Sequence, residues 1–396
     1  MKRSVAISID EDSWTTFGRT VPTELRPLSQ THNYNILTTM LRLGALTTPI
    51  RARGLSLNSF WAYIRYFGAF SSDASLRLQP DFYNLDPHQK TILSDDFGVA
   101  FSMEFLRDKL SLRRMCDGLY FMKHFAQKRG LTYANAPSVN GAQKCPDYIC
   151  LGADGKIHLI ECKGTQSGRT ALRKQMERGI EQKNSINVIG PRAGEKLVAG
   201  LLIKKNTARL GSELMICDPV DRSPSITIDE SDYIDAEDDI IVGDISRYVA
   251  ASGLEDTSFF LSSRIAANEL MTSGDTTSTT KSYLDRPYAE SEMEDISNND
   301  FTIEGRRYIG REQTIDLPKS FLVDGKHVSE AVVKSGIIDD LYLSLKEQAG
   351  RRSASGWPLF EIEKEFRQTE MPWENEDKYH GEIVESGVYA SSIVLR

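Results

Sequence analysis

The segment from Cys145 to Gly164 reads CPDYICLGADGKIHLIECKG and carries the side chains best suited to chemistry. Two short β-rich runs, Tyr148 to Leu151 and Lys156 to Ile160, flank the turn signal Gly-Ala-Asp-Gly. A three-residue loop, Ala153 to Gly155, would give its glycine the left-handed conformation that glycine tolerates. The sequence therefore predicts a β-hairpin whose pairing register is fixed by the loop.

This register brings three charged side chains to one end of the hairpin. The loop pairs Gly152 with Lys156, and counting along the ladder then pairs Asp147 with Glu161. Opposed residues of an antiparallel pair point to the same face, with β-carbons about 4.5–5.5 Å apart. Lys163 shares that face because it lies two residues beyond Glu161. The remaining residues of the face are apolar: Ile149, Leu151, Ile157 and Leu159.

Two carboxylates at this spacing repel, and one would be forced to bind a proton unless a cation lay beside them. Hard oxygen ligands on a partly hydrated site suit Mg²⁺, with Mn²⁺ as the second candidate. Such an ion lowers the pKa of a bound water and offsets charge on a scissile phosphate. Lys163 would orient the attacking water or stabilise the charge that develops on the phosphate. The alternative is that Asp147 merely starts a strand and that Glu161 and Lys163 form an exposed edge pair.

The residues Pro146-Asp147, followed by Glu161-Cys162-Lys163, resemble the motif of the PD-(D/E)xK nucleases, whose fold is also called restriction-endonuclease-like. The resemblance covers roughly Phe97 to Cys217, under a third of the chain. It implies an α/β fold whose core runs helix, strand, strand, strand, helix, strand. The candidate elements in that order are a helix from Phe97, a strand near Leu131 to Val139, the hairpin, a helix over Thr170 to Ser185 and a strand over Lys196 to Ile203.

The same resemblance implies which residues form the site. Its metal ligands and catalytic lysine would be Asp147, Glu161, the backbone carbonyl of Cys162, and Lys163. Glu104 is the best match for a further catalytic acid and metal ligand on the first helix, since it shares one helical stripe with Phe97 and Phe101. The alternative for Glu104, a surface glutamate, stays open. Gln175 is favoured over Gln182 as the functional glutamine of the second helix.

The charge distribution bears on nucleic-acid binding. The net charge of −8 disfavours it, but Lys163 to Arg209 holds eleven Lys/Arg against three Asp/Glu. Glu213 to Asp239 has one arginine among ten acids, and either stretch could instead be a solvated face. A polyanion responds to the local field. The expected phosphate contacts are Arg169, Arg173, Lys174, Arg178 and Lys183 after the motif, and Arg107, Lys109, Arg113 and Arg114 on the preceding helix.

The length of 396 residues predicts two or three domains. We expect a helical or mixed region over 1–95, the nuclease domain over 96–220, and a C-terminal α+β region over 221–396 with a mobile linker near 272–300. Outside the motif region, the patterns predict helices over Asn33 to Leu46, Leu57 to Phe70 and Ser329 to Gln348, a hairpin over Phe301 to Leu317, and a partly disordered tail from Arg351. The first helix of the motif region is expected within Phe97 to Arg129, as one long helix or two.

The composition argues against several other classes of protein. The five cysteines form no CxxC pair, which argues against a disulfide framework or a structural zinc site. No apolar run approaches the roughly 20 residues that span a bilayer, so a cytoplasmic location without membrane contact is expected.

The combined expectation is a Mg²⁺-dependent endonuclease, with DNA favoured over RNA. By analogy it would serve prokaryotic genome defence, in restriction or as an anti-phage effector, as a homodimer or with a partner protein. The alternative is a catalytically inactive or partner-activated nucleic-acid-binding subunit of a larger complex. The acidic stretch Glu213 to Asp239 would shield the basic surface until a partner arrives.

Overall fold

A computed structural model describes residues 1–16, 18–26, 30–50, 65–128, 145–183, 185–218, 226–262, 288–317, 321–323, 325–350, 373–376 and 379–396. Several predicted elements therefore lie wholly or mostly outside the described residues. They are the strand Leu131 to Val139, the first part of the linker near 272–300, most of the helix Leu57 to Phe70, and much of the tail from Arg351.

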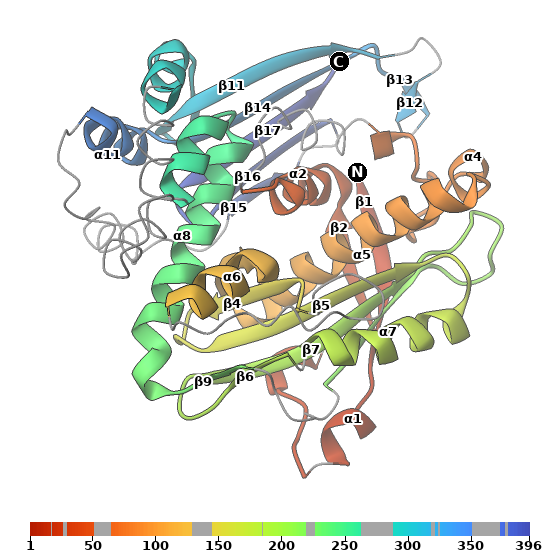
Figure 1. Cartoon of the computed structure of the whole chain (residues 1–396). Coiled ribbons are helices and arrows are strands. Elements are labelled where there is room, and N and C mark those ends of the chain that lie inside the picture. The colour runs from red at the N-terminus through yellow and green to blue at the C-terminus, as the bar shows by residue number, and fades with distance from the viewer. Residues whose placement is uncertain are drawn as a thin grey trace.

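The centre of the molecule is a mixed sheet of seven strands in the order β2-β1-β8-β7-β5-β4-β3 (Figure 1). Their bounds are β1 Lys2–Ile9, β2 Thr31–Asn35, β3 Leu112–Asp117, β4 Tyr148–Gly152, β5 Ile157–Thr165, β7 Ala193–Leu202 and β8 Glu213–Cys217. The pairs β5–β7 and β1–β8 are parallel and the others are antiparallel. The predicted α/β class is thereby confirmed.

Two helices cover opposite faces of this sheet. The helix α5 (Pro87–Leu110) packs its Phe97 and Phe101 into one cluster with Ile160 and Cys162 of β5. The helix α7 (Arg169–Lys183) packs Leu172 and Met176 on the other face, against Val198 and Leu202 of β7. Side chains of β5 therefore face either α5 or α7, according to their position along the strand.

The element order of this region is α5, β3, β4, β5, α7 and β7, which is the order that the motif resemblance implies. The helix α6 (Gly118–Lys128) is inserted between β3 and β4, and the short strand β6 (Ile186–Val188) lies between α7 and β7. The strand before the hairpin is thus β3, nearer the first helix than expected.

The prediction of one or two helices over Phe97 to Arg129 was wrong in its middle. α5 begins earlier, at Pro87, where the Asp86 side chain accepts hydrogen bonds from the backbone N–H groups of His88 and Gln89. It ends at Ser111, whose positive φ of 50° breaks the helix. The next six residues form β3 because they pair with β4, a long-range contact that overrides local periodicity.

A second, antiparallel sheet of six strands has the order β10-β11-β14-β17-β16-β15. Its strands are β10 Asp300–Ile303, β11 Arg306–Asp316, β14 Glu330–Ile338, β15 Trp373–Glu376, β16 His380–Glu385 and β17 Tyr389–Leu395. The hairpin predicted over Phe301 to Leu317 is confirmed, with positive φ at both turn residues, Glu304 and Gly305.

Two expectations for this half of the chain were wrong. The helix predicted over Ser329 to Gln348 is a strand, β14, followed by the helix α11 (Asp339–Gly350), because β14 pairs with both β11 and β17. The end of the predicted linker is a helix over residues 288–296, since Met293 and Ile296 bury their side chains in the core.

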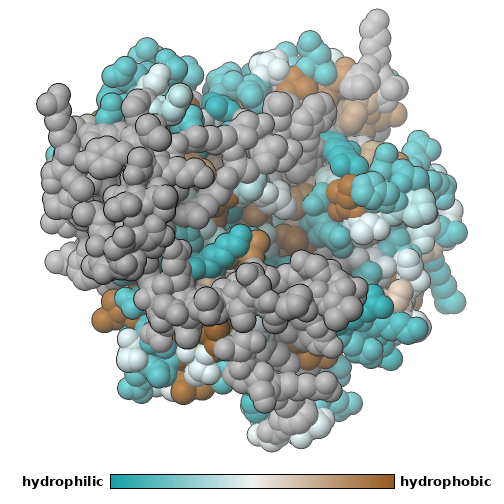
Figure 2. All heavy atoms as spheres, in the orientation of Figure 1, coloured by the Kyte–Doolittle hydropathy of each residue, from teal (hydrophilic) through white to brown (hydrophobic). Residues whose placement is uncertain are grey.

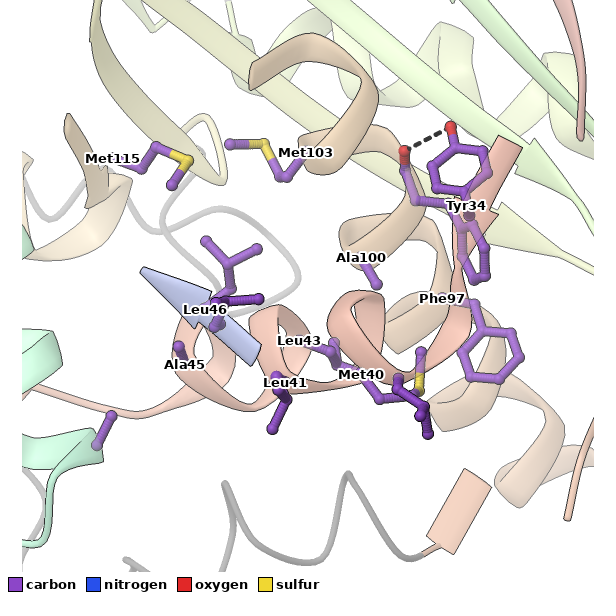
Figure 3. Close-up of a cluster of buried hydrophobic side chains, with 14 of the residues drawn as sticks. Tyr34, Met40, Leu41, Leu43, Ala45, Leu46, Phe97, Ala100, Met103 and Met115 are labelled. Atoms are coloured by element: carbon purple, nitrogen blue, oxygen red, sulfur yellow. Dashed lines mark hydrogen bonds between the residues drawn. The ribbon is translucent and has the colours of Figure 1, made fainter. Parts of the chain in front are cut away.

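One hydrophobic core joins the predicted regions. The helix α2 (Ile36–Thr47) begins at Asn35, whose side chain accepts a hydrogen bond from the backbone N–H of Leu37 at 3.1 Å. Figure 3 shows apolar side chains of α2 facing those of α5, with the Tyr34 hydroxyl donating to the carbonyl of Phe101 at 3.0 Å. The same cluster extends to Leu395 of β17, so residues from 1–95, 96–220 and 221–396 share it.

The remaining described elements include one long, mostly buried helix and several short segments. They are α1 Asp12–Thr15, the 3₁₀ turns Thr23–Leu25 and Glu230–Asp232, α4 Pro80–Tyr83, β9 Ile226–Ile228, α8 Tyr233–Ala251, β12 Leu322–Val323, β13 Lys326–His327 and a helix over residues 255–262. Within the described ranges, no helix combines the length and apolar character needed to cross a bilayer.

Candidate active site

The hairpin β4–β5 has the predicted loop and register. Tyr148 pairs with Ile160 and Leu151 with Ile157. The backbone N–H of Gly152 donates to the carbonyl of Lys156 at 2.9 Å, and Gly155 has a φ of +77°. Continuing this register by one residue sets Asp147 opposite Glu161. The four apolar residues predicted to share their face are buried in a single cluster: Ile149, Leu151, Ile157 and Leu159.

Direct contacts join the three predicted residues. The backbone N–H of Asp147 donates to Glu161 Oε2 at 3.1 Å, and Asp147 Oδ2 accepts from the backbone N–H of Cys162 at 2.8 Å. The Lys163 ammonium forms an ion pair with Glu161 Oε1. The Glu161 side chain is fully buried, whereas one fifth of the Lys163 side chain is exposed. The structure therefore brings Asp147, Glu161 and Lys163 together, with the lysine at the opening to solvent.

Burial and mutual repulsion shift the pKa values of the three residues of this site. Burial raises the pKa of Glu161 to about 8, the Asp147 carboxylate adds to the rise, and Lys163 opposes it. Burial also raises the pKa of Asp147, against the opposing effect of Lys163. Burial lowers the pKa of the Lys163 ammonium, but the two carboxylates outweigh burial and raise it. One lysine thus stays charged beside two carboxyl groups, one buried and one half-buried, and does not fully compensate both when they are ionised.

The helix α7 lies directly on this pair of residues at Gly179. A β-carbon at that position would lie 3.0 Å from Glu161 Cγ and 3.3 Å from Lys163 Cε. Gln175 precedes Gly179 by one helical turn and so shares its face. The amide oxygen of Gln175 is buried and, among the described residues, has no hydrogen-bond partner. An unsatisfied buried acceptor is costly, and this one lies on the helix face that covers the site.

Replacing Gly179 by alanine is therefore expected to destabilise the fold and to reduce any activity of the site. Helix propensity alone would favour alanine by about 1 kcal/mol. Crowding against Glu161 and Lys163 should cost about 1–3 kcal/mol, so the net sign is reversed. Urea unfolding checks this, with the exposed neighbour Glu177→Ala as the matched helical control. A Gly179→Ala variant more stable than the wild type would show that α7 does not press on the pair.

The prediction of Glu104 as a catalytic acid and metal ligand was wrong. Its carboxylate is buried and forms an ion pair with Arg42, with Glu104 Oε2 3.1 Å from Arg42 Nη1. Glu104 projects from α5, on the face of the sheet opposite to Glu161. It also lies six residues beyond Gly98, the point where α5 touches the backbone of Lys163, which is about 9 Å along the helix axis.

The acid of α5 that does approach the site is Asp95. Burial raises its pKa, the positive charge of Lys163 lowers it, and the negative charge of Asp147 raises it. The sequence feature that could have indicated Asp95 is the set of small residues Ser94, Gly98 and Gly164. These allow α5 and β5 to come into backbone contact.

Asp117, at the end of β3, is a second acid that the motif did not indicate. Its charge contributes to the raised pKa of Asp147. Its own side chain accepts a hydrogen bond from the backbone N–H of Tyr120 at 2.7 Å and so caps α6. The backbone N–H of Gly118 in turn donates to the carbonyl of Asp147 at 3.0 Å, which anchors the start of β4.

The side chains available as ligands can be compared with the needs of the predicted Mg²⁺. Among the described residues, no three His, Cys, Asp or Glu side chains are grouped so as to hold an ion. Asp147 and Glu161 supply two carboxylates, and Mg²⁺ usually keeps several waters and takes one or two carboxylates. The uncompensated charge of this pair fits a hydrated divalent ion. Cys162, whose carbonyl is the other predicted ligand, directly follows Glu161 in β5 and is paired with Ala199 of β7.

The basic residues of α7 are mostly available to a ligand. Arg173, Lys174 and Arg178 are exposed, and the surface over the right-hand end of α7 is largely hydrophilic (Figure 2). Arg169 instead pairs with Glu213 of β8, with Arg169 Nη2 2.6 Å from Glu213 Oε1. The side chain of Lys183 lies outside the described residues.

Two of the four basic residues predicted as phosphate contacts before the motif are buried, which contradicts that role. Arg107 Nη1 lies 2.6 Å from Glu385 Oε1, which Arg42 also contacts. Arg114 pairs with Asp244, with Arg114 Nη1 3.3 Å from Asp244 Oδ2. Arg113 and Arg114 lie on β3 rather than on the helix, and Arg113 and Lys109 are half-buried. The buried arginines join α5 and β3 to the C-terminal part of the chain.

The cysteines near the site behave as buried apolar residues. All five are free, and four of them are buried: Cys116, Cys150, Cys162 and Cys217. Burial raises the pKa of the Cys116, Cys150 and Cys162 thiols, so these three are poor nucleophiles at neutral pH.

A comparison of the chain with models of protein families, with curated proteins and with solved structures found no match. The chemistry of the site therefore follows from its own side chains. The groups at hand are a buried and a half-buried carboxylate, one charged and partly exposed lysine, and an unsatisfied amide on the covering helix.

Proposed function

We propose that this chain is a Mg²⁺-dependent nuclease that hydrolyses phosphodiester bonds at Asp147, Glu161 and Lys163. The observation that carries the proposal is the fully buried Glu161 carboxylate, held beside a second carboxylate and one lysine. A divalent cation would relieve the repulsion that raises the pKa of Glu161. The motif resemblance and the order of α5, β3, β4, β5, α7 and β7 support a restriction-endonuclease-like core.

Each side chain has a role that its position supports. Asp147 and Glu161 would hold the ion, together with the carbonyl of Cys162. The bound ion would supply a water of lowered pKa and charge to offset the scissile phosphate. Lys163, at the solvent opening, would exchange its contact with Glu161 for a phosphate oxygen or the attacking water. The orphaned amide oxygen of Gln175 would accept a hydrogen bond from a water in the same space.

DNA is the proposed substrate, with the exposed cations Arg173, Lys174 and Arg178 on phosphates. We extend the proposal, by analogy with the motif resemblance, to a cytoplasmic endonuclease of prokaryotic genome defence. Cutting both strands of a duplex would need two such sites, hence a homodimer or a partner protein.

The test is cleavage of supercoiled plasmid, linear duplex and single-stranded RNA by the full chain with Mg²⁺, Mn²⁺ or EDTA. We expect plasmid cutting with either metal, none with EDTA, and at least about a hundredfold loss in Lys163→Met. Lys156→Met, on the exposed turn of the same hairpin, is the matched control and should retain activity.

Cutting of RNA alone would overturn DNA as the substrate. A folded wild-type chain that cuts none of these substrates would favour the alternative of an inactive or partner-activated binding subunit.

A further inference from the structure

The loop between β7 and β8 presents an apolar side chain to solvent. Leu210 is 74% exposed, the highest fraction among the large hydrophobic residues that the structure describes. A single exposed leucine on a mobile loop needs no explanation. The loop from Lys204 to Gly211 is, however, held in place.

A neighbouring segment, Leu76 to Leu78, fixes both ends of this loop through backbone contacts. The N–H of Leu78 donates to the carbonyl of Lys204 at 2.8 Å, and the N–H of Asn206 donates to the carbonyl of Leu78 at 2.9 Å. At the other end, the Ser212 hydroxyl donates to the carbonyl of Leu76 at 2.8 Å. Leu210 is thus presented by an anchored loop rather than by a floppy one, which lowers the entropic cost of binding through it.

The charges on the loop that carries Leu210 are of one sign. The loop contains Lys204, Lys205 and Arg209 and no acid. Within the part of the chain that the structure describes, none of these three cations forms an ion pair. The nearby acids are already paired, Asp73 with Arg77 and Glu213 with Arg169. Unpaired cations around an exposed apolar side chain are complementary to a polyanion with apolar faces, which describes nucleic acid.

The loop is also close enough to the proposed site for one duplex to contact both. Lys163 is paired with Gly200 of β7, and the N–H of Ile203 donates to the carbonyl of Thr165 at 2.8 Å. Lys204 follows Gly200 by four residues, which is about 13 Å along a strand. A duplex rises about 3.4 Å per base pair, so a duplex that ran along β7 would meet the loop roughly four base pairs from the scissile phosphate.

We propose that the loop from Lys204 to Gly211 is a duplex-DNA contact in which Lys205 and Arg209 bind phosphates and Leu210 packs against bases in a groove. This inference rests on the proposed function, because it takes the substrate to be DNA. It adds a surface outside the motif region that sets where the duplex lies relative to Lys163.

The test is fluorescence anisotropy of a labelled duplex of about 30 base pairs, titrated with the full chain in EDTA between about 50 and 200 mM KCl. Leu210→Ser should weaken binding about tenfold without changing the salt dependence, because it removes apolar contact only. Lys205→Ala with Arg209→Ala should lower the slope of log affinity against log salt by about two. Leu343→Ser, at an exposed leucine of α11, is the matched control.

Leu210→Ser binding as tightly as the wild type, or a wild type that does not bind the duplex, would overturn the loop's role. The nuclease proposal and the proposed DNA contact of the loop can be refuted independently of each other. Leu210-dependent binding without cleavage refutes the nuclease and keeps the loop. Cleavage that depends on Lys163 but not on Leu210 refutes the loop and keeps the nuclease.

Discussion

Replacing Asp147 by asparagine is expected to lower metal-dependent cleavage about a thousandfold and to leave the metal-free chain at least as stable as the wild type. Asparagine can still accept the hydrogen bond from the backbone N–H of Cys162, so the start of β4 should keep its position. The substitution removes the negative charge that would bind Mg²⁺. In the absence of metal, that charge attracts Lys163 but also repels Glu161 and raises its pKa, so its loss should cost the fold little.

The two effects are measured separately, as plasmid cleavage rates with Mg²⁺ and as urea unfolding in EDTA. Asp154→Asn is the control, since Asp154 lies on the exposed turn of the same hairpin and pairs with Lys156. Loss of activity together with severe unfolding would show that Asp147 is structural. Activity within tenfold of the wild type would remove Asp147 from the site.

The second large effect is a pH-dependent stabilisation by Mg²⁺. The pKa of Glu161 is about 8 in the folded chain and its ordinary value is 4.5. The folded state therefore binds a proton that the unfolded state releases between these values. Without metal, this group's contribution is complete below about pH 4.5 and is lost as pH rises to about 8, by up to roughly 1.4 kcal/mol per pH unit.

Mg²⁺ would replace that proton, so it should stabilise the chain more at alkaline pH than at pH 6. The measurement is urea unfolding across pH with and without Mg²⁺, for the wild type and for Glu161→Gln. Glutamine mimics the protonated acid, and the difference between the two curves isolates Glu161 from other groups that titrate. An equal effect of Mg²⁺ at every pH, or an effect that persists in Glu161→Gln, would contradict a metal at this carboxylate.

The hairpin could be predicted from sequence because its determinants are local. The loop length and Gly155 set the register, and the alternation of Ile157 and Leu159 set the buried face. Together these place Glu161 and Lys163 on one face before any tertiary contact is considered. In the β4–β5 hairpin, local rules and the final fold therefore agree.

The acid of the first helix could not be predicted, because it depends on where two elements touch. Glu104 fits the helical periodicity, but α5 contacts β5 through Gly98, one helical turn after Ser94. That contact point places Asp95 near Lys163 and carries Glu104 away to Arg42. The contact point along this helix thus decides which of its acids lies near Lys163.

Buried charges were misassigned for a similar reason. Arg107 and Arg114 are cations on a basic stretch, and nothing local marks them as interior residues. Their partners, Glu385 and Asp244, lie 278 and 130 residues further along the chain. The same holds for β14, which becomes a strand because β11 and β17 flank it.

The parallel pairing of β1 with β8 has a consequence for synthesis on the ribosome. Ala6 to Ile9 must wait for Glu213 to Ile216, about 200 residues later, before the central sheet can close. At bacterial or eukaryotic translation speeds, this interval is roughly 10–40 s. During it, β1 can pair with β2, but its other edge stays open, and the apolar side chains of Val5 and Ile7 lie on this incomplete sheet. The β4–β5 hairpin emerges before its sheet is complete, so we expect the yield of folded protein to depend on protection of the open sheet edge during synthesis as well as on local foldability.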